Sequence, residues 1–190
     1  MRHMSANNGC ARATRALLVV LSGCCGAKGN RDADQVYRAL LAQVAPTLEG
    51  AERPLRTLVV IADAGERGDR WLPLKARLPA AMRDTYDDFC ARSGTPSLHE
   101  ISEAGGCSIL VASQLQLPGD TGIAIREFEA LFRKSYPNAA LVTLSGVGFS
   151  TARTQALVYL SEPSHYGAFY LLELVGQKWV LAGEYVVWVA

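Results

Sequence analysis

Hydrophobic and polar positions alternate along the last quarter of the chain, residues 140–190. In the segment 155–161, Ala156, Val158 and Leu160 fall on one side, and the remaining residues fall on the other. An alternation with a period of two, bounded by turn residues, is typical of strands in an antiparallel sheet. Both sides of this segment are largely apolar, which predicts cover on both faces. Three of the four runs in this quarter show such alternation, and the short connections between all four predict a four-stranded meander.

The dipeptide Gly176-Gln177 predicts the turn between the last two strands. A type II′ hairpin needs a positive φ at its first central residue, which glycine adopts readily. The turn pairs residues 168–175 with residues 178–189 and places Glu173 opposite Val180. Strict alternation then places five apolar residues of the last strand on one side: Trp179, Leu181, Tyr185, Val187 and Val189.

Upstream of residue 140 the pattern predicts three helices and two strands. Apolar residues recur at helical spacing in 32–44, in a helix that starts near Pro79, and around 128–136, where Pro137 ends the helix. The second helix is expected to place Met82, Tyr86, Phe89 and Cys90 on one face. The runs 55–62 and 108–117 read as strands, the first buried on both faces. The sequence therefore predicts one α+β domain over residues 32–190, with three helices packed on a mainly antiparallel sheet.

The C-terminal segments also carry a family resemblance. They are Ser135-Tyr136-Pro137, Leu144-Ser145-Gly146-Val147-Gly148-Phe149, Thr154-Gln155-Ala156-Leu157-Val158-Tyr159, Tyr170-Leu171-Leu172-Glu173, Trp179-Val180 and Trp188-Val189. This succession resembles a group of uncharacterised bacterial proteins, many of which are described as lipoproteins. The resemblance implies a fold group and a cell-envelope location, and no activity. Members of the group often have a turn rich in glycine and cysteine where this chain has residues 162–165.

The N-terminal segment has the order of a bacterial lipoprotein signal. Arginines without acidic residues come first, residues 16–21 form a short apolar core, and Leu21-Ser22-Gly23-Cys24 follows. The tetrapeptide resembles a lipobox, so residues 1–23 are expected to be a signal peptide and Cys24 to carry fatty acyl chains such as palmitate. Residues 24–31 would form a tether, and two or more chains would anchor the domain firmly in the membrane. In the alternative interpretation, residues 17–21 are a buried strand and Cys24 is incidental.

Composition limits the classes of partner. The chain has 190 residues with 49% hydrophobic and 19% charged residues, which is ordinary for one globular domain. No apolar run approaches the roughly 18 residues that a membrane-spanning helix needs. Loss of residues 1–23 would leave 16 basic and 18 acidic residues, so no excess of positive charge points to nucleic acid. We expect neither a cofactor nor a metal ion.

The remaining cysteines offer one candidate disulfide. Cys25 would lie in the tether. Cys90 and Cys107 are separated by enough chain for a disulfide between them to stabilise the fold, and an oxidising envelope would permit it. Alternatively, Cys90 is an ordinary buried thiol on the apolar face of its helix. No cysteine spacing resembles a zinc motif.

Residues that could support catalysis are few. His99 and His165 lie in loops and lack metal-ligand spacing, and Ser145 is not in a G-x-S-x-G nucleophile elbow. Gly146 and Gly148 lack the third glycine of a dinucleotide fingerprint, and they more simply permit a bulge or a close crossing. Asp63 follows a predicted strand, where a site residue or a turn former would both fit.

A pocket on a sheet face is the remaining candidate site. Tyrosine and tryptophan side chains at positions 71, 159, 166, 170, 179, 185 and 188 could line such a face or form core. The candidate pocket residues are Tyr159, His165, Tyr170 and Glu173. Glu173 and Glu184, on the same predicted hairpin, are either a carboxylate pair or solvent-facing charges.

Three functional hypotheses follow. The first is a lipid-anchored envelope protein that faces the periplasm or the exterior, whose domain binds a protein or a small apolar ligand, or serves structurally, without catalysis. The second is an envelope hydrolase with a pocket that uses His165 or Glu173. The third is a cytosolic binding domain whose N-terminus is not cleaved.

Overall fold

The computed structural model describes residues 31–48, 55–62, 79–92, 98, 101–111, 125–162 and 165–190. Several expectations fall on residues outside these ranges. They concern the signal peptide, Cys24 and most of the tether, Asp63, Trp71, His99 and residues 112–117 of the second strand.

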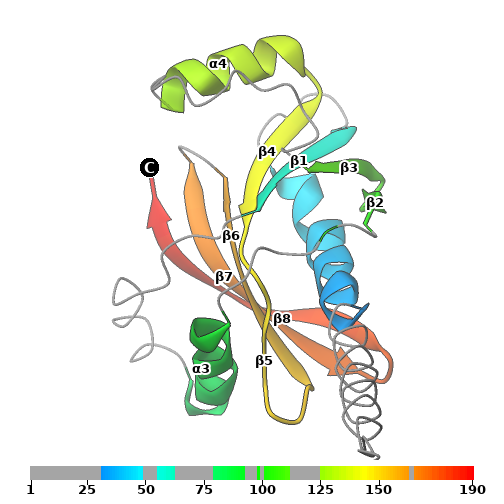
Figure 1. Cartoon of the computed structure of the whole chain (residues 1–190), viewed down its shortest axis with the longest axis vertical. Coiled ribbons are helices and arrows are strands. Elements are labelled where there is room, and N and C mark those ends of the chain that lie inside the picture. The colour runs from blue at the N-terminus through cyan, green and yellow to red at the C-terminus, as the bar shows by residue number, and fades with distance from the viewer. Residues whose placement is uncertain are drawn as a thin grey trace, which may run out of the picture.

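One eight-stranded sheet forms the centre of the described part of the chain (Figure 1). Its strand order is β2-β3-β1-β4-β6-β7-β8, and the short β5 pairs beside β6. The strands are β1 (Thr57–Ala62), β2 (Glu103–Ala104), β3 (Cys107–Val111), β4 (Ala139–Leu144), β5 (Gly148–Phe149), β6 (Gln155–Glu162), β7 (Tyr166–Val175) and β8 (Lys178–Val189). The helices are residues 31–44, α3 (Arg83–Ala91) and α4 (Ile125–Ser135), with short 3-10 turns η1 (Ala45–Thr47) and η3 (Ala80–Met82).

The α+β class is confirmed, but the expectation of a mainly antiparallel sheet is wrong. β1 lies between β3 and β4 and runs parallel to both, so the sheet is mixed. The chain passes through α3 between β1 and β3, and through α4 between β3 and β4. Parallel neighbours need such long crossovers, whereas antiparallel ones can be joined by short turns. A connection that contains a helix precedes both β3 and β4, which is consistent with their parallel pairing to β1.

The C-terminal meander is confirmed. β4, β6, β7 and β8 are successive antiparallel neighbours. A type II′ turn needs a positive φ at its first central residue and a negative φ at its second. Gly176 has a φ of +64°, and Gln177 is not among the described residues with positive φ, so the turn fits this type. The turn pairs Val175 with Lys178 and places Glu173 opposite Val180, as the sequence predicted.

Strict alternation along β8 does not hold. The pairing with β7 shifts by one residue at Ala182 and again at Val187. Each extra residue moves the following side chains to the opposite face. Trp179 and Leu181 therefore contact one core cluster, whereas Tyr185 and Val187 contact another on the other side of the sheet.

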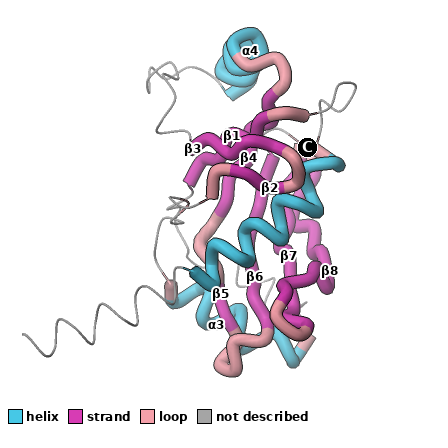
Figure 2. The backbone as a smooth tube through the Cα atoms, turned by 90° about the vertical axis from the view of Figure 1, so that its right-hand side faces the viewer, coloured by secondary structure: helices cyan, strands magenta, loops and turns pink. Residues whose placement is uncertain are grey.

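The two faces of the sheet are covered by different helices. We call the face covered by helix 31–44 the inner face and the opposite one the outer face (Figure 2). Val36, Leu40 and Leu41 of that helix are fully buried against the inner face. On the outer face, α3 packs through Tyr86 and Phe89, and α4 packs at the other end of the sheet through Phe132 (Figure 1). β1 and β6 are consequently buried on both sides, as the sequence predicted.

Candidate functional site

The structure does not bring the four candidate pocket residues together. Tyr159 packs in the outer-face cluster, whereas Tyr170 belongs to the inner-face cluster. His165 precedes β7 and Glu173 lies near its far end, eight residues away. At about 3.3 Å per residue their backbones are roughly 26 Å apart. Glu173 instead accepts a hydrogen bond from Gln155 Nε2 at 3.1 Å.

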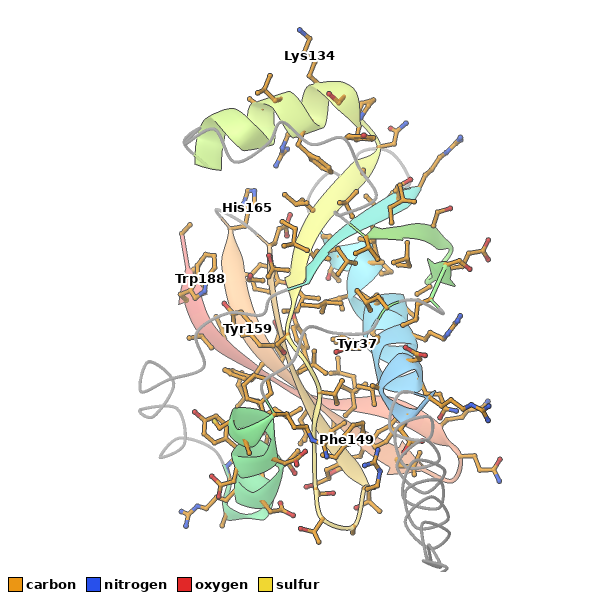
Figure 3. All side chains as sticks on the ribbon, viewed as in Figure 1. Tyr37, Lys134, Phe149, Tyr159, His165 and Trp188 are labelled. Atoms are coloured by element: carbon orange, nitrogen blue, oxygen red, sulfur yellow. The ribbon has the colours of Figure 1, made fainter. Side chains whose placement is uncertain are left out.

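Helix 31–44 fills the inner face, where an enclosed apolar pocket would need room. Tyr37, Leu40 and Leu41 are each at most 1% exposed there. The Tyr37 hydroxyl donates to the carbonyl oxygen of Ser145 at 2.8 Å, which ties the helix to the segment after β4 (Figure 3). The aromatic residues of the inner face are therefore mainly core.

A chain of hydroxyl groups lies on the inner face near the C-terminus. The Tyr170 hydroxyl donates to Glu184 Oε1 at 3.1 Å and lies 3.0 Å from the Tyr166 hydroxyl. Because the carboxylate can only accept, the Tyr170 hydroxyl donates its hydrogen bond to Glu184 and accepts one from the Tyr166 hydroxyl. Burial raises the pKa of both phenols above the ordinary value of 10.0. Both remain protonated donors at neutral pH, which suits a structural role better than that of a base.

On the outer face, Trp188 and Tyr159 lie over Gly167. Trp188 Nε1 donates to the Tyr159 hydroxyl at 2.9 Å (Figure 3). A Cβ atom at position 167 would overlap both Trp188 Nε1 and the Tyr159 hydroxyl. Glycine at this position therefore makes room for the hydrogen bond.

His165 contacts three other parts of the chain. Its Nε2 atom lies 3.4 Å from Arg133 Nη2 on α4, its backbone N–H donates to the Glu162 carbonyl, and its carbonyl accepts from the N–H of Ala190. Since a guanidinium can only donate, Nε2 is the acceptor in the Arg133 contact. These contacts give His165 a role in holding α4 and the chain end against the sheet.

Ser145 is a structural residue in this fold. Its hydroxyl donates to the Gly146 carbonyl at 2.9 Å and accepts the N–H of Tyr159 at 2.9 Å. It thereby continues the contact between the end of β4 and β6. Gly148 follows, and a Cβ there would overlap Phe89 of α3, so the expected close crossing is confirmed.

The two described cysteines lie in different surroundings. Cys90 is exposed, so its expected place on the apolar face of α3 is wrong; the buried side carries Thr85, Tyr86 and Phe89 instead. Cys107 is buried, its Sγ donates to the Leu55 carbonyl at 3.2 Å, and burial raises the pKa of the thiol. No disulfide joins Cys90 to Cys107.

A shallow groove with a positive rim lies between helix 31–44 and the β7–β8 turn. Its volume is about 280 Å³, and it is lined by Gln35, Arg38, Ala39, Gln177, Lys178 and Trp179. Sequence reasoning missed this site because its two walls are about 140 positions apart in the chain. Only the fold, in which the turn lies beside the helix, brings Arg38 and Lys178 to one place (Figure 1).

Within the described ranges, no three or more His, Cys, Asp or Glu side chains are grouped so that they could hold a metal ion. No helix of the described part has the length and apolar character needed to cross a bilayer. No protein-family model, curated protein or solved structure gives a match to this chain.

Proposed function

We propose that the chain is a lipid-anchored protein of the bacterial cell envelope and that its α+β domain acts by binding or support, without catalysis. One observation carries the proposal: Leu21-Ser22-Gly23-Cys24 follows a basic and then an apolar segment. Acylation of Cys24 by two or more chains would hold the domain at a membrane surface.

The structural role of the polar side chains supports the non-catalytic part of the proposal. Ser145, Tyr159 and Tyr170 each use their hydroxyls in contacts between elements of the fold. A hydrolase that used His165 or Glu173 would need that residue in a cleft with other polar groups. His165 instead contacts Arg133 of α4, and Glu173 accepts a hydrogen bond from Gln155.

The partner that fits best is another protein. A small apolar ligand enclosed by the sheet would need the space that helix 31–44 occupies on the inner face. Four valines of the last hairpin stay exposed, by 43% to 74%: Val175, Val180, Val186 and Val189. Exposed apolar side chains of this kind suit contact with a protein surface better than with a solute.

Replacement of Cys24 by Ser tests the anchor. The full chain would be expressed in a bacterial host, and membranes would be separated and washed at alkaline pH. We expect the wild type to stay with the membranes and to show the mass of the acylated chain from Cys24, and the Cys24→Ser variant to be released. The Cys25→Ser variant is the matched control and should behave as the wild type. Membrane retention of Cys24→Ser, or a native mass that starts at Met1 without acyl chains, would contradict the proposal.

A further inference from the structure

β8 forms one edge of the sheet and lies along one margin of the described structure (Figure 2). It is 12 residues long, whereas β2 at the other edge has only 2. Within the described ranges, no strand pairs with the outer side of β8. An edge strand presents a row of backbone N–H and C=O groups, which are complementary to those of another extended strand. The chemistry of this edge therefore specifies a polypeptide strand as its partner.

The regular part of the edge is the segment 178–181, between the hairpin turn and the first register shift. In an antiparallel ladder, successive residues alternate between bonding to the partner strand and facing away from it. Lys178 closes the two-residue turn and Val180 follows two residues later, so the backbone groups of both face β7. Those of Trp179 and Leu181 consequently face outward, where a neighbouring strand can bond to them.

A second copy of the chain supplies a complementary strand. When two β8 edges meet antiparallel about a two-fold axis at Val180, Trp179 of each copy lies opposite Leu181 of the other. These two residues can then exchange their backbone hydrogen bonds. Val180, which is 43% exposed, meets Val180 of the second copy on the outer face. The side chains of Trp179 and Leu181 lie on the inner face and would pack against each other across the axis.

The charges along β8 favour this arrangement. Lys178 and Glu184 are its only charged residues; both are exposed, and their signs are opposite. In the register centred on Val180, Lys178 lies beside residues 182–184 of the second copy, of which only Glu184 is charged. The pairing therefore brings opposite charges near each other and places no like charges in opposition.

The pairing is complete with two molecules. Because each copy uses the same edge, the contact is isologous and closes on itself. The extra residue at Ala182 ends the regular ladder, and β2 at the far edge is too short to pair well with a third copy. A dimer is therefore the expected product of this contact, and a filament is not.

We propose that two copies of the chain associate through the segment 178–181 of β8, with Val180 on the two-fold axis, so that their sheets become continuous. The inference rests on the proposed function, whose protein partner it specifies as a second copy of the chain. Exposed Val180 then gains an apolar neighbour, and the outward backbone groups of the segment gain hydrogen-bond partners.

Disulfide trapping in the full chain tests this arrangement. In Val180→Cys, the two Cα atoms at the axis would be about 4.5 Å apart, which a disulfide can span. Mild oxidation of the purified protein should give a dimer with a 180–180 link. Mass spectrometry of the linked peptides distinguishes this link from those of the native cysteines.

Val175→Cys is the matched control for the trapping. Val175 is 63% exposed, more than Val180, but it lies on β7. In the proposed dimer, three strand spacings, roughly 14 Å, would separate the two copies of this residue. Val175→Cys should therefore give no 175–175 link under the same oxidation.

A charge substitution tests the same contact without a new covalent bond. Val180→Lys places two like charges opposite each other at the axis, so dimerisation should weaken on the order of fivefold. Sedimentation of the full chain over a range of concentrations measures the change. Val175→Lys adds the same charge at a more exposed position and should leave dimerisation unchanged. Circular dichroism of both variants checks that the fold is kept.

Three results would overturn the proposal. The first is a wild-type chain that stays monomeric at every concentration and forms no more 180–180 link than 175–175 link. The second is a dimer that Val180→Lys does not weaken, which would place the interface elsewhere. The third is a 180-linked product that contains a different protein in place of the second copy. Failure of the anchor would show separately, as membrane retention of Cys24→Ser, so the two failures are distinguishable.

Discussion

The carboxylate of Asp88 on α3 accepts the backbone N–H of Phe149 on β5, with 2.7 Å between Oδ2 and N. One turn earlier in α3, Asp84 accepts the N–H of Thr151 at 3.1 Å. The backbone N–H groups of residues 149 and 151 thus donate hydrogen bonds to carboxylates of α3 and not to a neighbouring strand. Because Gly148 lies against Phe89, the helix approaches β5 closely enough for these short side chains to reach.

Loss of the Asp88 carboxylate should destabilise the domain. In Asp88→Ala the Phe149 N–H loses its charged acceptor in a partly buried position, so we expect the free energy of unfolding to fall by about 1.5–3 kcal/mol. Urea denaturation followed by circular dichroism measures the change.

Two further variants separate this bond from the ion pair that Asp88 forms with Arg92 at 2.6 Å. Arg92→Ala should cost less, about 0.5 kcal/mol, because exposed i,i+4 pairs contribute little. Asp88→Asn keeps an oxygen acceptor and should recover part of the loss. An Arg92→Ala variant as unstable as Asp88→Ala would refute the role assigned to the Phe149 bond.

The buried phenol of Tyr170 predicts a loss of stability in alkali. Its pKa is raised in the folded protein, so the folded state keeps a proton that the unfolded state releases near pH 10. This contribution is therefore full below pH 10 and is lost as the pH rises further, by up to about 1.4 kcal/mol per pH unit.

The Tyr170→Phe variant checks that prediction. At pH 7 it should be less stable than the wild type by about 1 kcal/mol, because the hydrogen bond to Glu184 is gone. The difference should shrink and then change sign in urea titrations carried from pH 7 to pH 11. A difference that stays constant over this range would show that Tyr170 ionises alike in both states.

Gly167 should tolerate no larger side chain. In Gly167→Ala the new methyl group would overlap both Trp188 and Tyr159, and overpacking of this kind costs about 1–3 kcal/mol. Urea midpoints measure the loss, and a shift in tryptophan emission would report the moved indole. Gly183→Ala is the control, since its Cβ would come no closer than 3.3 Å to its nearest neighbour, the Tyr185 side chain. Equal losses in the two variants would contradict the argument.

The features that the sequence predicted correctly depend on neighbouring residues. The II′ turn follows from Gly176 alone, the burial of β1 from its apolar run, and helix 31–44 from the spacing of Val36, Leu40 and Leu41. Each signal lies within a few positions of the element that it specifies.

The features that the sequence missed depend on distant contacts. The parallel pairs of β1 follow from two crossovers, and the change of face after Ala182 follows from packing against β7. The prediction of a pocket was wrong for the same reason: Tyr159 and Tyr170 lie on different strands, and their side chains point to opposite faces of the sheet. The groove formed by Arg38 and Lys178 likewise exists only once the helix and the turn are side by side.

The register shifts in β8 affect how neighbouring molecules can meet. β8 is the last strand of the described sheet, and an edge strand offers its outer amides as a template for further strands. The irregularities at Ala182 and Val187 divide this row of amides into short stretches. Where two copies of the chain meet at this edge, a row of amides broken in this way would keep the encounter from growing into a polymer.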